Sequence, residues 1–90
     1  MKTRYFVKAY SFSTITNAER YHYFGKGEHL VGYIILERGP YGTLNWDKND
    51  VKKYGFASFK AAQEALVKMK RAEKPERGWT TVFTLIAEGF

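Results

Sequence analysis

KKYGFASFKAAQEALVKMKR, residues 52–71, decides the fold, because it holds the clearest helical pattern in the chain. Ser58 is placed to cap a helix, since its hydroxyl can accept a hydrogen bond from a backbone N–H of the first turn. The apolar positions that follow recur at helical spacing: Phe59, Ala62, Leu66 and Met69. The sequence therefore predicts one amphipathic helix over about residues 58–73, with its lysine-rich side in water.

Two interpretations are open for the turn before this helix, where Tyr54 and Phe56 flank Gly55 beside two lysines. In the first, Phe56 packs under the helix start as a hydrophobic staple, and Gly55 accommodates the backbone. In the second, the basic and aromatic residues of the turn bind nucleic acid. The order of residues over KKYGFASFKAAQEAL resembles the arm-binding modules of phage-type integrases, which are small β-sheet DNA-binding domains. The resemblance ends there, because the strand predicted at 79–88 lies outside their three-stranded plan, and we assign no family.

The rest of the chain reads mainly as β-strands. RYFVKAYSFSTI, residues 4–15, has strand composition, and neither of its faces is cleanly polar. The period of two assigns to one face Tyr5, Val7, Ala9, Ser11 and Ser13, and to the other Phe6, Lys8, Tyr10, Phe12 and Thr14. LVGYIILER and TLNWDK, at 30–38 and 43–48, read as a hairpin joined by GPYG, in which Pro40 suits a tight turn. Residues 16–29 are irregular or weakly β. WTTVFTLIAE, 79–88, is apolar or β-branched on both faces, which is typical of a central strand.

These elements predict an α+β domain, with residues 1–90 as a single unit. Its simplest form is an antiparallel sheet of about four strands with one helix, at about 58–73, packed on one face. The order is strand, irregular segment, strand, strand, helix, strand. The opposite sheet face then has no assigned partner within the chain.

Composition and charge limit the classes of function. The chain carries a formal charge of +6, and between residues 48 and 77 there are nine basic side chains against four acidic ones. Such an excess favours encounters with polyanions, acidic proteins or anionic surfaces. Without cysteine, neither disulfides nor thiolate metal sites can form. No apolar run reaches membrane-spanning length and no convincing signal peptide is present, so we expect a cytoplasmic protein without a membrane partner.

Catalytic and metal-binding patterns are missing from the sequence. There is no nucleophile elbow, phosphate-binding glycine loop or HExxH helix. His22 and His29 lie near two glutamates, but their spacing does not build a ligand set. We therefore expect no enzyme activity, no cofactor, no metal and no small-molecule substrate.

The aromatic surplus points to binding instead, because seven tyrosines, seven phenylalanines and two tryptophans exceed the needs of one small core. Tyrosine and tryptophan are favoured at protein interfaces, and they also stack on single-stranded bases. We expect a binding module that contacts a protein or a second copy of itself, with nucleic acid as the alternative partner. Small size and the lack of motifs suggest a phage-encoded protein. The candidate binding residues are Lys8, Tyr10, Tyr33, Arg38, Tyr41, Trp46, Lys48, Lys52, Lys53 and Tyr54.

Overall fold

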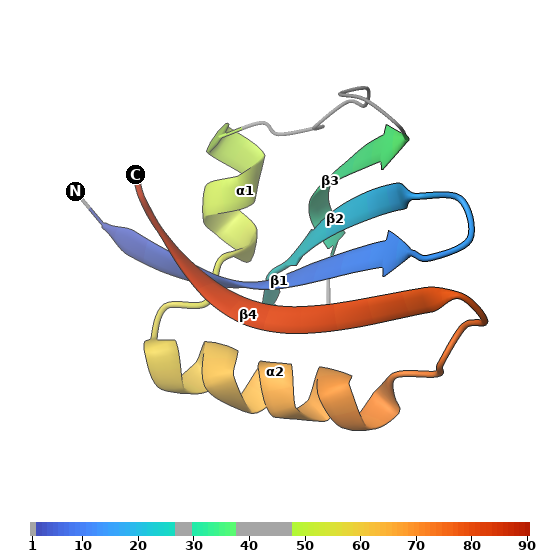
Figure 1. Ribbon diagram of the computed structural model, residues 1–90. Coiled ribbons are helices and arrows are strands. Elements are labelled where there is room, and N and C mark those ends of the chain that lie inside the picture. Colours follow the sequence, from blue (N-terminus) through green and yellow to red (C-terminus); the bar gives the residue numbers. More distant parts are fainter. Residues whose placement is uncertain (1, 27–29, 38–47) are drawn as a thin grey trace.

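A four-stranded antiparallel sheet and two helices make up the described part of the chain (Figure 1). The computed structural model describes residues 2–26, 30–37 and 48–90, with the backbone alone at 30–37 and 48–50. The strands are β1 (Thr3–Ser13), β2 (Ala18–Phe24), β3 (Leu30–Glu37) and β4 (Trp79–Gly89), and the helices are α1 (Lys48–Tyr54) and α2 (Phe59–Ala72). Strand order is β3-β2-β1-β4, so β1 lies in the middle of the sheet with β2 and β4 beside it.

The α+β class, the antiparallel sheet and the main helix are confirmed. Three of the four predicted strands are found, as β1, β3 and β4. Residues 43–47 of the predicted strand at 43–48 lie outside the described residues, together with the GPYG turn, and Lys48 begins α1. The place next to β1 is taken by β2, which forms within the segment predicted to be irregular.

Helix α2 begins and ends almost where the sequence predicts. The Ser58 hydroxyl accepts a hydrogen bond from the backbone N–H of Ala61 at 3.1 Å, and this caps the first turn. Ala62 is fully buried against the sheet, while Leu66 and Met69 are half-buried. Phe59, predicted to be a core residue, is 52% exposed and meets the Tyr5 ring edge-on at 5.8 Å. The first turn of α2 therefore lies at the margin of the core.

The two faces of the sheet are covered by different helices. Helix α2 packs over β1 and β4 on the face that carries Tyr5 and Ala9, called the α2 face below. On the opposite face, called the α1 face, the buried Val51 of α1 packs against the buried Phe6 of β1. In Figure 1, β1 and β4 run between α1 above and α2 below. The prediction of a single covering helix is thus wrong for the end of the sheet near the termini. Asn49 and Asp50 form a pair that is typical of a turn, yet both residues lie in α1.

The chain passes from one face to the other through the turn at residues 55–58. Phe56 forms an isolated antiparallel bridge with Tyr5, with N–H to carbonyl distances of 2.8 and 3.0 Å. This bridge extends the ladder of β1 past the end of β2. Gly55 is required here, because a Cβ atom on it would lie 2.5 Å from the Cβ of Arg4. The turn therefore carries the chain from one face of the sheet to the other, and its backbone hydrogen bonds to Tyr5 fix the position of Phe56.

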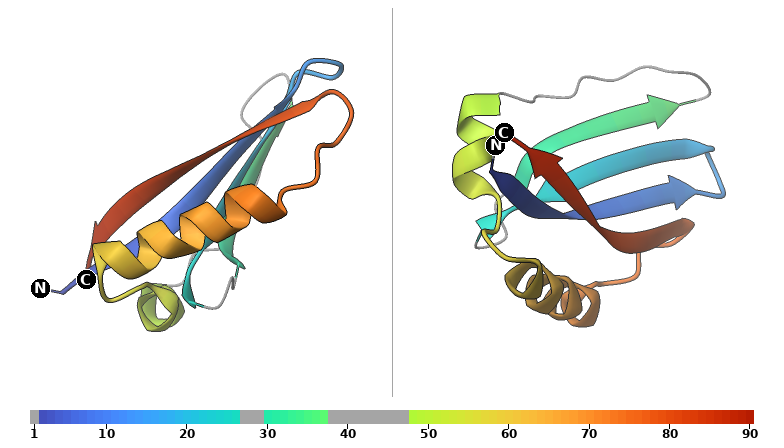
Figure 2. Two further views of the ribbon diagram at one scale, coloured as in Figure 1. Left: turned by 90° about the horizontal axis from the view of Figure 1, so that it is seen from below. Right: turned by 90° about the vertical axis from the view of Figure 1, so that its left-hand side faces the viewer.

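β4 lies at an edge of the sheet, which corrects the prediction of a central position. Figure 2 shows β4 at the margin next to β1, with the termini close together at one end. Both chain ends are tied into the ladder, since Lys2 and Phe90 exchange two backbone hydrogen bonds of 2.8 Å. In the part of the chain that is described, neither helix has the length and apolar character needed to cross a membrane.

Candidate functional site

The half of the α1 face that α1 does not reach carries a cluster of aromatic side chains. Its residues, called the tyrosine surface below, are Lys8, Tyr10, Phe12, Glu19, Tyr21 and Val82. They share one face because the antiparallel register sets Tyr10 directly between Tyr21 of β2 and Val82 of β4. The aromatic members are half-buried, and Val82 is 47% exposed. An apolar surface thus remains open on a folded sheet.

The rings of the tyrosine surface pack against one another. The Tyr10 ring centroid lies 4.9 Å from that of Tyr21 and 5.9 Å from that of Phe12, with the ring planes tilted by 33° and 30°. These spacings fall in the range of favourable aromatic pairs. The Lys8 ammonium lies over the Tyr21 ring, 5.0 Å from its centroid. The cluster is therefore ordered before any partner binds, so that little side-chain entropy remains to be lost on binding.

A hydrogen bond fixes the centre of the tyrosine surface. The Tyr10 hydroxyl donates to Oε1 of Glu19 at 2.7 Å. This hydrogen bond, followed by partial burial and by the negative charge of Glu19, raises the pKa of Tyr10 to about 12. With this raised pKa the phenol stays neutral throughout the physiological range and keeps donating its hydrogen bond to the Glu19 carboxylate.

Replacing Glu19 with alanine should lower the pKa of Tyr10 from about 12 toward the usual value near 10. Because folding raises this pKa, the stabilising contribution of the neutral phenol is present below about pH 10 and is lost as the pH rises through about 12. Absorbance at the phenolate band, or the NMR shift of the ring carbon that bears the oxygen, follows the titration. Glu64→Ala on the exposed side of α2 is the control, and an unchanged Tyr10 titration in Glu19→Ala would contradict the assignment.

Of the predicted binding residues that the structure describes, Lys8 and Tyr10 are brought together on this surface. Tyr33 lies on β3 opposite His22 in the register, one row away from the partners of Tyr10. Lys48 begins α1, whose last turn contains Lys52 and Lys53, and Tyr54 ends the helix 39% exposed. The other three lie outside the described residues: Arg38, Tyr41 and Trp46.

Sequence reasoning missed four members of the tyrosine surface: Phe12, Glu19, Tyr21 and Val82. Phe12 was assigned to the same strand face as Lys8 and Tyr10, which is correct, yet it was not singled out for binding. The alternation of side chains in AERYHYF places Glu19 and Tyr21 on one face, but only if that segment is taken as a strand. Their position beside Tyr10 depends on the register of β1 with β2, which one sequence does not specify.

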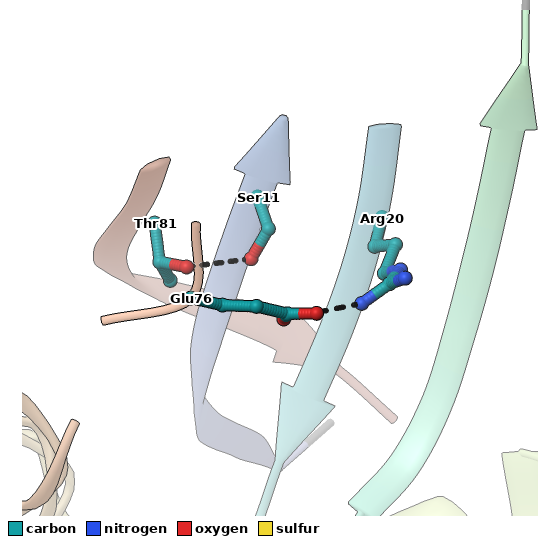
Figure 3. A network of polar contacts seen from close by, with 4 residues as sticks. All are labelled: Ser11, Arg20, Glu76 and Thr81. Carbon is teal, nitrogen blue, oxygen red and sulfur yellow. Dashed lines mark hydrogen bonds and ion pairs between the residues drawn. The ribbon is translucent and has the colours of Figure 1, made fainter. Parts of the chain in front are cut away.

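The α2 face carries a cavity of about 360 Å³ between the sheet and the end of α2. Its floor is largely apolar, with Phe24, Phe83 and Met69 among the lining residues. Figure 3 shows two polar contacts at its wall: the hydroxyls of Ser11 and Thr81 lie 2.8 Å apart, and Nη1 of Arg20 lies 3.8 Å from Oε2 of Glu76. These contacts join β1, β2, β4 and the segment after α2 around one hollow.

The chemistry of the cavity does not single out one ligand class. The Arg20 guanidinium stacks on the Trp79 ring at 3.8 Å from its centroid, and burial followed by the charge of Arg20 lowers the pKa of His22. Lys74 adds a second positive charge at the rim, while Glu73 and Glu76 supply two negative charges. With opposite charges in balance, neither an anion nor a cation is favoured. No group of acidic and histidine side chains suited to a metal ion is found among the described residues.

No protein-family model matches the chain, and no solved structure matches it significantly. A function must therefore be inferred from the chemistry of the chain's own surfaces.

Proposed function

We propose that this protein is a non-enzymatic binding module whose tyrosine surface docks on a partner protein. The observation that carries the proposal is the ordered cluster around Tyr10, whose rings pack on each other and stay half-exposed instead of filling the core. Tyrosine is enriched among the few residues that dominate binding energy at protein interfaces. A rigid aromatic cluster with one apolar neighbour, Val82, has the composition of such an interface centre.

The charges on the tyrosine surface favour a protein over a nucleic acid. Lys8 is its single cation and Glu19 its single anion, and they flank the aromatic rings. Binding of single strands needs repeated positive charge along the backbone and open ring faces for the bases. Here the Lys8 ammonium already lies over Tyr21, and Glu19 would repel phosphate. The exposed lysines Lys52 and Lys53 belong to α1, which covers the other end of this face.

The test uses the full chain as bait in an extract of the cells that contain it. Wild-type protein is compared with Tyr10→Ser/Tyr21→Ser, whose fold is checked by circular dichroism. We expect at least one protein to be retained by the wild type and lost by the double variant. With that partner purified, loss of the two rings should raise the dissociation constant at least about 30-fold, which corresponds to about 2 kcal/mol at a dominant interface residue.

Phe59→Ser is the matched control, because it removes a partly exposed ring from the α2 side of the sheet. It should retain the partner with unchanged affinity. The proposal fails if all three baits retain the same proteins. It also fails if a mixed-sequence oligonucleotide binds through Tyr10 and Tyr21 with an affinity that falls steeply as salt is raised, since that dependence reports phosphate contacts.

A further inference from the structure

The outer edge of β4 presents a row of open backbone groups. In the ladder between β1 and β4, even-numbered residues of β4 bond to β1, as the paired bonds between Lys2 and Phe90 and the bond from Thr14 to Gly78 show. Antiparallel pairing alternates, so the residues between them direct N–H and C=O away from β1. These are Thr81, Phe83, Leu85 and Ala87. Within the described residues, no strand pairs with this edge.

β4 also lacks the features that normally protect an edge strand. Such strands carry lysine, proline, a bulge or a short length to prevent further pairing. β4 spans 11 residues, contains neither lysine nor proline, and has Glu88 as its single charge. Its register with β1 runs without a shift from Trp79 to Gly89. The strand therefore has the sequence of a central strand while it occupies an edge.

We infer that β4 pairs antiparallel with β4 of a second copy of this chain, which joins the two sheets into one. A two-fold axis at Phe83 places the two Phe83 side chains opposite each other, Trp79 opposite Ala87, and Thr81 opposite Leu85. On the other face, Val82 meets Thr84 and Ile86 meets Thr80. Glu88 falls opposite Gly78 of the other copy, which keeps the two carboxylates at far ends of the shared ladder. The strand is thus complementary to itself, as a two-fold interface requires.

Hydrogen exchange at single amides tests this pairing directly, together with the mass in solution. The mass from sedimentation or light scattering should reach twice 10.5 kDa as concentration rises. In a monomer, the amides of Val82, Thr84 and Ile86 are protected by β1, whereas those of Phe83 and Leu85 exchange freely. In the paired dimer both sets are protected. Protection of Phe83 and Leu85 should therefore rise with the fraction of dimer.

Two variants with matched controls separate the edge from other surfaces. Thr84→Glu places a carboxylate opposite Lys8 within the monomer but brings two carboxylates within about 8 Å across the axis, so the dimer dissociation constant should rise about tenfold or more. Thr84→Gln, of equal size and uncharged, should leave it unchanged. Ala87→Pro removes an outward N–H from an exposed position and should also weaken pairing.

The outcomes are distinct from those of the tyrosine surface. A protein that stays monomeric at several hundred micromolar overturns the inference. So does a dimer in which Phe83 and Leu85 exchange freely, because its contacts must lie elsewhere. Pairing through β4 is supported by a dimer that survives Tyr10→Ser/Tyr21→Ser but is lost in Thr84→Glu, while the amides bonded to β1 stay protected. That result does not test whether a different protein docks on the tyrosine surface.

Discussion

Phe6→Ala is expected to lower the free energy of unfolding by about 3–5 kcal/mol, the usual range when a buried phenylalanine is truncated. Phe6 is completely buried in the middle strand of the sheet and packs against Val51 of α1. Its ring meets the Phe90 ring edge-on at 6.5 Å, and Ile86 lies opposite it in the β1–β4 register. Truncation would leave a cavity that joins α1, the middle strand and the C-terminus, so three elements would lose packing together.

Chemical denaturation followed by circular dichroism gives the measurement. Domains of this size are stable by about 5–15 kcal/mol, so the variant should unfold at a much lower denaturant concentration or be partly unfolded in buffer. Phe59→Ala makes the same chemical change at a position that is 52% exposed and should cost about 1 kcal/mol. Equal losses in the two variants would show that α1 does not cover Phe6.

Helix α2 and the first and last strands of the chain could be predicted because their signals are local. Ser58 and the apolar repeat behind it specify α2 within one residue at each end, since capping and helical periodicity act over a few positions. β1 and β4 are long runs of β-branched and aromatic residues. Their side-chain faces follow from the period of two, which correctly separated Phe6 and Lys8 from Val7.

The remaining features depend on contacts between distant segments. AERYHYF becomes β2 because the strand can pair on both sides, with β1 and β3, and no local signal reports that. The prediction of a central β4 rested on its apolar faces. In the observed strand order β4 nevertheless lies at the edge of the sheet, with a strand on one side only among the described residues. The tyrosine surface combines both problems, since Tyr10 and Tyr21 meet only in the observed register. Three predicted binding residues, Arg38, Tyr41 and Trp46, lie outside the described residues.

Gly25→Ala is expected to displace α1 from the sheet. Gly25 is buried directly after β2, and a Cβ atom on it would overlap the backbone carbonyl of Tyr54, the last residue of α1. A carbonyl inside a helix end cannot rotate away as a flexible side chain does. Either β2 or α1 must therefore move. β2 is paired with a strand on each side, whereas α1 is held by the packing of Val51 against Phe6, so α1 should move. We expect a loss of about 3 kcal/mol or more, at or above the upper end of overpacking costs.

Gly89→Ala is the matched control, because Gly89 is an exposed glycine at the end of β4 and the same methyl group there meets water. Denaturation compares the stability of the two variants, and hydrogen exchange shows where packing is lost. If α1 moves as a unit, protection should fall in α1 and around Phe6 while the amides of α2 keep theirs, since α2 is anchored on the other face by Ala62 and the Ser58 cap. A Gly25→Ala protein as stable as Gly89→Ala would mean that the end of α1 does not lie against the end of β2. The chain would then have to pass from α1 to α2 by a route other than the turn at Gly55 and Phe56.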